Sequence, residues 1–433
     1  MHTYSGVSSF DLIVVGAGAA GIIAAGRAAR LGARVLLLEK MKSPGRKILI
    51  TGKGRCNITH DAPVSAYYKH IYPSGRFLKH AFNAFFTKDI IDILHQQGVK
   101  TTTERGNRVF PVSNQSKDVL QALLRWMGTT NIDIHYGVRV AELVVENGLV
   151  SGVRATIQEG ERVYHAPAVV VCTGGKSYPA TGSTGDGYEL ARQVGHQITP
   201  VRPALVPLVT AGDLAGRLQG LGLKNVNAVV WVDGSKAAEA FGELMFAHYG
   251  LTGPIILTLS RLVVDALLAG KQVEISIDLK PALDDKKLDT RLLRDLNSHG
   301  KKQIENMFKQ WLPSKLIPVF LEELSIDGKK LCNQIDGNER RSIRQRMKNF
   351  RFQITGHPGF KEAIITAGGV PVTEIDSKTM ESKLTKGLYF AGELIDLDGE
   401  TGGFNLQIAF STAWLAAGSA MKKPPSCPDH ETK

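Results

Sequence analysis

The sequence predicts an α/β protein whose parallel-sheet domain is interrupted by a β-rich insertion. Three observations predict this fold. A glycine-rich turn joins a strand-like run to a helix near the N-terminus, another strand-like run ends in paired glycines at residues 168–175, and a third precedes an apolar helix near the C-terminus. From about Pro200 the chain changes to short β-type runs. Alternating strands and helices favour a parallel sheet, so the first and last parts of the chain should form one domain.

The composition is that of a folded protein with more than one domain. The chain has 433 residues, of which 43% are apolar and 22% charged, close to the averages of soluble globular chains. This excludes a short disulfide scaffold and wholesale disorder. The 53 Lys and Arg against 41 Asp and Glu give a net charge of +12, which favours an anionic ligand or surface.

Several features indicate a cytoplasmic protein without a membrane span. No basic segment precedes the first apolar run, and the two most apolar stretches, 12–26 and 404–421, are too short or too polar to cross a bilayer. The cysteines form no CxxC pair, which argues against a disulfide framework. They are Cys56, Cys172, Cys332 and Cys427.

The first element is a strand, turn and helix with the pattern Gly16-x-Gly18-x-x-Gly21. The first glycine permits the turn, the second lets a pyrophosphate approach the backbone, and the third lets helix and strand pack closely. Glu39 ends the next strand-like run. A carboxylate there accepts hydrogen bonds from a ribose 2′-hydroxyl and opposes a 2′-phosphate. The motif therefore predicts a Rossmann-type site for FAD or NAD.

The middle of the chain changes character twice. Residues 75–128 alternate helical pattern with loops, and residues 134–173 form short runs divided by turns at 146–148 and 159–160, which predicts a small β-meander. Residues 284–351 are charge-rich with a local charge of +6, which we interpret as solvated helices rather than a nucleic-acid surface. The expected segments are 1–196, the first part of the nucleotide-binding domain; 197–283, an inserted β-rich domain; 284–349, a helical subdomain; 350–363, the return strand of the insertion; and 364–433, the second part of the nucleotide-binding domain.

The C-terminal element favours FAD over NAD. Glu393 follows a strand-like run and precedes a short loop and a long apolar helix. In flavoproteins of the glutathione-reductase superfamily such a carboxylate holds ribityl hydroxyls, and the helix N-terminus faces the pyrimidine end of the flavin. The superfamily's middle signal, a strand ending in an ATG-like turn, matches residues 169–175.

The segment at residues 45–60, GRKILITGKGRCNITH, combines glycines with cations. Arg46, Lys47 and Arg55 could pair with the pyrophosphate or with reduced flavin, and a basic surface loop is the alternative. We interpret Cys56 as packing against the flavin rather than as a redox group, because no second cysteine is near in sequence.

Together, VVGAGAAG, GRKILITGKGRCN, TGGKSYPATGSTGDGY, GELMFAHYGLTGP, ITAGGV and AGELIDLDGETGGFNLQIAFSTAW resemble motifs of the bacterial BaiN-like flavoprotein family, described as NAD(P)/FAD-dependent or aminoacetone oxidase-like oxidoreductases. The resemblance spans about residues 10–418. It implies a glutathione-reductase-type FAD domain in two parts, interrupted by a β-barrel-like domain with a helical subdomain. It also implies NAD(P)H as a transient electron donor and a small-molecule substrate, of which conjugated enones of bile-acid type are the best known class.

The resemblance also implies a set of site residues. The cofactor-binding residues would be Gly16, Gly18, Ala19, Ala20, Gly21, Glu39, Lys40, Arg46, Lys47, Gly52, Gly54, Arg55, Cys56, Asn57, Val140, Gly174, Gly392, Glu393, Gly403, Phe404, Asn405 and Leu406. The substrate side would be formed by Thr366, Ala367, Gly368, Gly369 and Val370. The histidines show no HExxH pattern and no paired Cys/His spacing, so we expect no metal site.

An enone that accepts a hydride also needs a proton donor. His248 and Tyr249 are our candidates, with His357 and Tyr178 in similar glycine- and proline-rich loops, although a side chain of this kind taken alone is more often structural. Two other functions remain open: an amine oxidase that passes electrons to oxygen, and a flavoprotein that binds or modifies RNA. No RNA-binding module is recognisable in the sequence, so a nucleic-acid partner is not expected.

Overall fold

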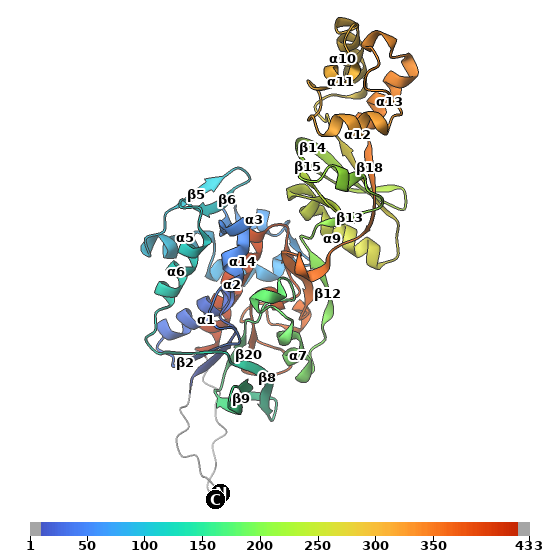
Figure 1. The fold of residues 1–433 in the computed structure, drawn as a ribbon. Coiled ribbons are helices and arrows are strands. Elements are labelled where there is room, and N and C mark those ends of the chain that lie inside the picture. Colours follow the sequence, from blue (N-terminus) through green and yellow to red (C-terminus); the bar gives the residue numbers. More distant parts are fainter. Residues whose placement is uncertain (1–9, 423–433) are drawn as a thin grey trace, which may run out of the picture. The chain divides into compact units, whose positions relative to one another are not determined.

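The computed structural model describes residues 10–422, which form two compact units (Figure 1). Residues 10–203 together with 364–422 form unit 1, and residues 204–363 form unit 2. Cys427 lies outside the described residues. Among the described residues, no helix combines the length and the apolar character that crossing a membrane requires.

A five-stranded parallel sheet forms the centre of unit 1 and confirms the predicted Rossmann-type domain. The C-terminal strand β20 pairs with β11, so the first and last parts of the chain share one sheet, as predicted. The inner strands are apolar along their whole length because both faces of the sheet are covered. In sheet order the strands are β20 (Leu388–Phe390), β11 (Val169–Val171), β1 (Leu12–Val15), β2 (Val35–Glu39) and β7 (Ile132–Tyr136).

Helix α1 (Ala19–Arg30) and helix α14 (Gly402–Ala420) pack against each other in unit 1. Most residues of α14 are buried on all sides, which explains why the sequence shows an uninterrupted apolar run there. Gly26 lets α1 approach α6 closely, because a β-carbon at this position would lie 2.6 Å from the Trp126 ring. The other helices of unit 1 are α2 (Arg46–Ile50), α3 (Val64–Tyr67), α4 (Lys79–Ala84), α5 (Thr87–Gln96), α6 (Ser116–Met127) and α7 (Asp186–Gln193).

Four further small sheets lie around this core. The predicted meander forms an antiparallel sheet, β8 (Arg139–Glu146), β9 (Leu149–Ile157) and β10 (Gly160–His165). The hairpin of β5 (Thr101–Glu104) and β6 (Arg108–Pro111) lies in a stretch that we expected to contain only helices and loops. Its first strand, Thr-Thr-Thr-Glu, carries no apolar alternation to signal it. The remaining short strands are β3 (Thr59–His60), β4 (Ile71–Tyr72), β12 (Thr199–Ala204), β19 (Ile365–Gly369) and β21 (Asp398–Gly399).

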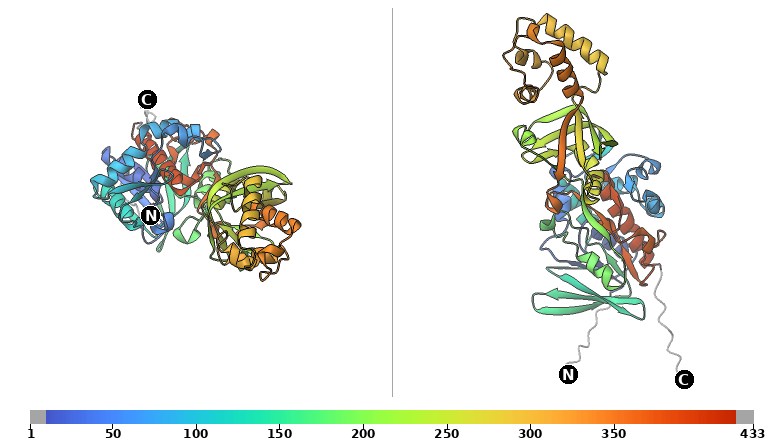
Figure 2. Two further views of the ribbon diagram at one scale, coloured as in Figure 1. Left: turned by 90° about the horizontal axis from the view of Figure 1, so that it is seen from above. Right: turned by 90° about the vertical axis from the view of Figure 1, so that its right-hand side faces the viewer.

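Unit 2 contains a closed six-stranded barrel, which confirms the β-barrel-like insertion. Helix α9 (Pro254–Leu268) packs against its strands. Helices α10–α13 gather at the barrel end where β17 stops and β18 starts (Figure 2). The strands are β13 (Leu208–Thr210), β16 (Gly250–Thr252), β15 (Ser235–Ala247), β14 (Gly222–Val232), β17 (Val273–Asp278) and β18 (Phe350–Gly356); the other helices are α8 (Leu214–Arg217), α10 (Asp285–Ser298), α11 (Ile304–Phe308), α12 (Leu316–Glu322) and α13 (Gly337–Lys348).

Candidate functional site

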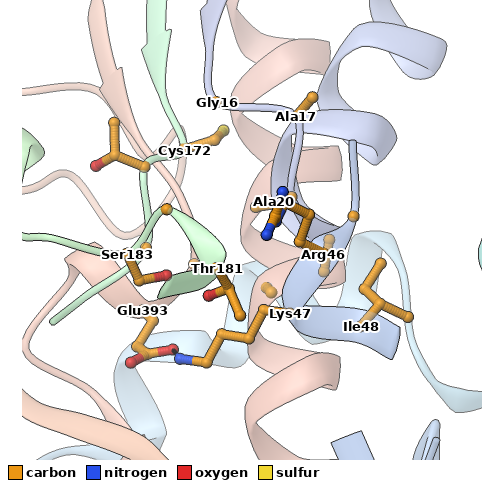
Figure 3. A pocket seen from close by; sticks show the side chains of 18 of the residues that line it. Gly16, Ala17, Ala20, Arg46, Lys47, Ile48, Cys172, Thr181, Ser183 and Glu393 are labelled. Atoms are coloured by element: carbon orange, nitrogen blue, oxygen red, sulfur yellow. Dashed lines mark hydrogen bonds and ion pairs between the residues drawn. The ribbon is translucent and has the colours of Figure 1, made fainter. Parts of the chain in front are cut away.

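The glycine-rich turn between β1 and α1 opens one end of a pocket in unit 1 (Figure 3). Gly16 has a φ of +97°, and a β-carbon there would lie 2.8 Å from the carbonyl oxygen of Cys172. A β-carbon on Gly21 would lie 1.7 Å from the carbonyl oxygen of Gly16, whereas one on Gly18 would meet no atom within 4 Å. The first and third glycines therefore serve the turn and the packing, and the second leaves room for a ligand.

Glu39 holds this turn in place from the end of β2. One carboxylate oxygen accepts a hydrogen bond from the Ala17 amide at 2.7 Å, and the other accepts one from the Met41 amide at 2.8 Å. The residue is buried, with 8% of its surface exposed. Each carboxylate oxygen can accept a second hydrogen bond, so the geometry leaves capacity for a ribose hydroxyl.

Two long helices direct uncapped N-termini at the same pocket. Gly18 precedes α1 and Thr401 precedes α14, and in neither helix does a side chain cap the first turn or an acidic residue occupy it. The amides of a first helical turn have no partner within the helix and attract negative charge. A dinucleotide such as FAD carries a pyrophosphate and an electron-accepting ring, so this donor set fits it.

A hydrogen-bonded network joins four chain segments at the α14 end of the pocket. Glu393 accepts from the Lys47 ammonium at 2.7 Å, from the Ser177 hydroxyl at 2.8 Å and from the Thr366 amide at 2.9 Å. Figure 3 shows the Lys47 ammonium directed at Glu393. Lys47 also donates to Ser177 at 2.6 Å. The Glu393 carboxylate thereby connects four parts of the chain: its own segment after β20, helix α2, strand β19 and the segment that follows β11.

A second ion pair joins the pocket walls near Glu39. The Lys40 ammonium bonds the carboxylate of Asp186 at 2.8 Å and also contacts Thr184. Burial alone would raise the pKa of Asp186, but the hydrogen bonds from Lys40 and Thr184 lower it. Gly182, in the same loop, approaches Met41 so closely that a β-carbon would lie 2.8 Å from its Cγ. The ion pair and this close contact therefore hold loop 181–186 against the segment that follows β2.

The structure brings many of the predicted cofactor residues together and leaves others outside the pocket. Those that line it are Gly16, Gly18, Ala19, Ala20, Glu39, Lys40, Arg46, Lys47, Val140, Gly174, Gly392, Glu393, Asn405 and Leu406. Those that do not line it are Gly21, Gly52, Gly54, Arg55, Cys56, Asn57, Gly403, Phe404 and the substrate-side residues 366–370. All of these assignments stay predictions for a bound cofactor.

Several predicted residues have clear protein partners instead. Phe404 stacks on His60 with a centroid separation of 4.1 Å, and Arg55 pairs with Glu104. Cys56 is fully buried, and burial raises the pKa of its thiol to about 11. A thiol of this kind is inert at neutral pH, which agrees with a packing role.

Sequence reasoning also missed residues that line the pocket, among them Thr181, Ser183 and Asp186. They belong to TGSTGDG, a motif that supported the family resemblance without being assigned a role. The proton-donor candidates His248 and Tyr249 lie in unit 2, at the turn between β15 and β16. Burial and the contact with Glu362 raise the pKa of the Tyr249 hydroxyl.

Comparisons with known proteins identify the family of this chain. The chain matches the HI0933-like protein Rossmann domain over residues 10–419. It is 32% identical to a 3-dehydro-bile acid delta(4,6)-reductase of Clostridium scindens, over 95% of this chain and 99% of the relative. It is 31% identical to a ribosomal RNA dihydrouridine synthase of Escherichia coli, over 94% of this chain and 97% of the relative.

A solved structure with the same fold is the 3-ketosteroid delta1-dehydrogenase of Sterolibacterium denitrificans. The TM-score is 0.50 at 13% identity, over 96% of this chain and 100% of that chain. This likeness supports the fold alone. The family match and the whole-length relatives lead to one conclusion. The chain belongs to the HI0933-like family of FAD-dependent oxidoreductases.

Proposed function

We propose that the protein reduces a carbon–carbon double bond conjugated with a carbonyl group, using FAD and with NAD(P)H as the electron donor. The pocket of unit 1 carries the proposal, because two uncapped helix N-termini, Glu39 and the Glu393 network meet in it. These groups suit the phosphates, the ribose and the ribityl chain of one dinucleotide.

The names of the two relatives support the reaction class. A delta(4,6)-reductase of a 3-dehydro-bile acid saturates double bonds conjugated with a ring ketone. A dihydrouridine synthase saturates the C5–C6 bond of uracil, which is conjugated with the C4 carbonyl. In both reactions a hydride adds to an electron-poor carbon conjugated with the carbonyl, the β-carbon or the vinylogous δ-carbon, and a proton then adds to the enolate, so one active-site chemistry serves both.

Bound FAD would supply hydride transfer through N5 of its ring, from a nicotinamide to the substrate. The chain's own residues bind and orient the reactants. The α1 N-terminus would hold the pyrophosphate, Glu39 the adenosine ribose and Glu393 the ribityl hydroxyls. The positive end of α14 would stabilise negative charge at the pyrimidine edge.

The donor would have to visit the substrate side for a short time. The sequence contains one Gly-x-Gly-x-x-Gly turn with its strand, helix and acidic residue, and the cofactor would occupy it. A two-step reaction in which NAD(P)H leaves before the substrate enters follows from this arrangement.

An anaerobic stopped-flow experiment tests the proposal. FAD-loaded protein is mixed with NADH or NADPH and the loss of the oxidised flavin band is followed; the reduced protein is then mixed with 4-androstene-3,17-dione, a neutral steroid enone. We expect bleaching in the first step and recovery of the band in the second. The oxidase alternative predicts a different result. An amine would bleach the flavin and hydrogen peroxide would form in air, whereas neither NADH nor NADPH would bleach it.

A second candidate substrate is a uracil base in RNA. One observation favours it: seven exposed cations of the helical part of unit 2 make no ion pair within the described residues. They are Lys286, Lys301, Lys302, Lys309, Lys315, Lys329 and Arg341. Binding to ribosomal RNA that weakens steeply with salt, with dihydrouridine formed on incubation with NAD(P)H, would establish this substrate. No retention of RNA at physiological salt would exclude it.

A further inference from the structure

Arg46 lines the pocket of unit 1 and makes no ion pair with a described residue. Its guanidinium donates one hydrogen bond, to the carbonyl of Ala180 at 3.3 Å, and points into the pocket (Figure 3). The other cations of the lining pair with Asp186 or Glu393; they are Lys40, Lys47 and Arg139. An anionic ligand in this pocket would therefore meet positive charge that no carboxylate neutralises at Arg46.

Ser183 adds an unused hydroxyl to the same lining. Only 8% of the residue is exposed, and its hydroxyl makes no hydrogen bond with a described residue. The hydroxyls of its neighbours Thr181 and Thr184 donate within their own loop instead. Figure 3 shows the Ser183 hydroxyl turned into the pocket. A buried hydroxyl without a partner costs free energy, and a ligand with an acceptor oxygen beside it would remove that cost.

The backbone that carries Arg46 lies against the glycine-rich turn before α1. The amide of Gly45 donates to the carbonyl of Ala17 at 2.8 Å and fixes the start of α2 to this turn. Gly45 has a φ of +66°, a conformation that favours glycine. Arg46 is the next residue. Its side chain therefore starts beside the turn in which Gly18 leaves room for a ligand.

Ser183 approaches the same turn through the segment that follows β11. A β-carbon on Gly174 would lie 3.2 Å from the Ser183 hydroxyl oxygen. Two residues earlier, the carbonyl oxygen of Cys172 would lie 2.8 Å from a β-carbon on Gly16. The ion pair described above holds loop 181–186 in this position. Arg46 and Ser183 thus belong to two separate segments that both contact the glycine-rich turn.

We infer that Arg46 and Ser183 bind the pyrophosphate of the cofactor, together with the amides of the first turn of α1. The inference rests on the FAD site of the proposed function and assigns a subsite within it. A pyrophosphate carries negative charge on each phosphate, whereas a helix N-terminus supplies only about half a positive charge. The Arg46 guanidinium adds a full charge and can bond two phosphate oxygens at once. The Ser183 hydroxyl donates to a further oxygen.

This assignment separates three cations that are equivalent in the sequence. Lys47 is neutralised by Glu393, and Arg55 is neutralised by Glu104. Arg55 also lies outside the pocket lining. Arg46 combines a place in the lining with a charge that no described carboxylate neutralises, so the phosphates belong to Arg46 and the ribityl side to the network of Lys47.

Two fragments of FAD separate the pyrophosphate from the flavin. ADP contains the pyrophosphate without the flavin, and riboflavin contains the flavin and the ribityl chain without a phosphate. Binding of each fragment to the full-length protein freed of FAD is measured by titration calorimetry. We expect Arg46→Gln to weaken ADP binding about 10- to 100-fold and Ser183→Ala about 3- to 30-fold, because each removes hydrogen bonds to a charged group. Riboflavin binding should stay within about twofold of wild type in both variants, since this fragment has no phosphate.

Arg105→Gln and Ser65→Ala are the matched controls, because both side chains are exposed and lie outside the pocket lining; neither should change either affinity. Unchanged ADP affinity in Arg46→Gln and Ser183→Ala would overturn the inference. A loss confined to riboflavin would also overturn it, because the side chains would then serve the flavin. So would equal losses for ADP and riboflavin with a lower melting temperature, which would indicate a structural role. Enone reduction does not enter this assay, so a failure of the proposed reaction is distinguished from a failure of this inference.

Discussion

Glu39→Gln tests how the ribose-binding end of the pocket is built. Both carboxylate oxygens of Glu39 accept backbone hydrogen bonds, from Ala17 at 2.7 Å and Met41 at 2.8 Å, and the side chain is buried. Glutamine has a single acceptor oxygen, so its amide group would face one of these N–H groups, donor against donor. One hydrogen bond to a charged group is lost, which costs about 1.5 to 3 kcal/mol.

The substitution should appear in two measurements. The dissociation constant for FAD, from fluorescence quenching during titration of the apoprotein, should rise about 10- to 150-fold, because the ribose hydroxyl also loses a hydrogen bond to a charged carboxylate and each 1.4 kcal/mol is a factor of ten. The melting temperature of the apoprotein should fall, since the same bonds fix the turn without FAD. Glu161→Gln, on the exposed strand β10, is the control and should change neither value. FAD affinity within twofold of wild type, with an unchanged melting temperature, would refute the role given to Glu39.

Three further predictions concern other residues. Lys40→Met or Asp186→Asn removes the ion pair that holds loop 181–186, so FAD should dissociate about 3- to 30-fold faster in a trapping experiment. The control Lys42→Met should leave the rate of FAD release unchanged. An unaltered release rate in Lys40→Met and Asp186→Asn would contradict a role of this ion pair in holding the cofactor. Burial lowers the pKa of His60 from 6.5 to about 4, and the charges of Arg108 and His70 contribute to this shift. The free energy of unfolding should therefore fall by about 3 kcal/mol as the pH falls from about 6.5 to 4, because the unfolded chain binds a proton in this range before the folded protein does. Above pH 6.5 the imidazole is neutral in the folded and the unfolded chain, so stability does not change through this group. Urea unfolding at several pH values should show this dependence in wild type and a weaker one in His60→Asn; parallel curves would argue against it. In a Cys427→Ala background, maleimide should label the native protein slowly at pH 7.5 because burial raises the pKa of Cys56, Cys172 and Cys332, and rapid stoichiometric labelling would show an open core.

Local signals in the sequence were enough to predict the nucleotide-binding core. The spacing of Gly16, Gly18 and Gly21 encodes a steric requirement, and the structure shows it as contacts of 2.8 and 1.7 Å that a β-carbon would make. The end of β2 at Glu39 follows from a short apolar run. The C-terminal strand and helix were predictable for the same reason, because burial on all sides leaves an uninterrupted apolar pattern.

Contacts between distant segments could not be predicted in the same way. Lys40 and Asp186 are 146 positions apart, and Lys47 and Glu393 are 346 apart, so no local pattern pairs them. Strand β15 lacks an apolar alternation in sequence, because the less exposed Ala238, Ala240 and Gly242 alternate with exposed residues that include Phe241 and Met245. Whether a glycine-rich loop turns toward the pocket, as 181–186 does, or away from it depends on packing that only the folded chain establishes.

The order of the central sheet has a consequence for synthesis of the protein. Strand β11 pairs on one side with β1, but its other neighbour, β20, is translated more than 200 residues later. Until β20 is synthesised, the three valines of β11 form an unpaired apolar strand edge, which could pair with a strand of another chain and cause aggregation. Unit 2 has all of its strands by residue 356 and can fold in the interval. A chain that terminates early would therefore carry a complete barrel and half of a cofactor site, with Glu39 present and Glu393 missing.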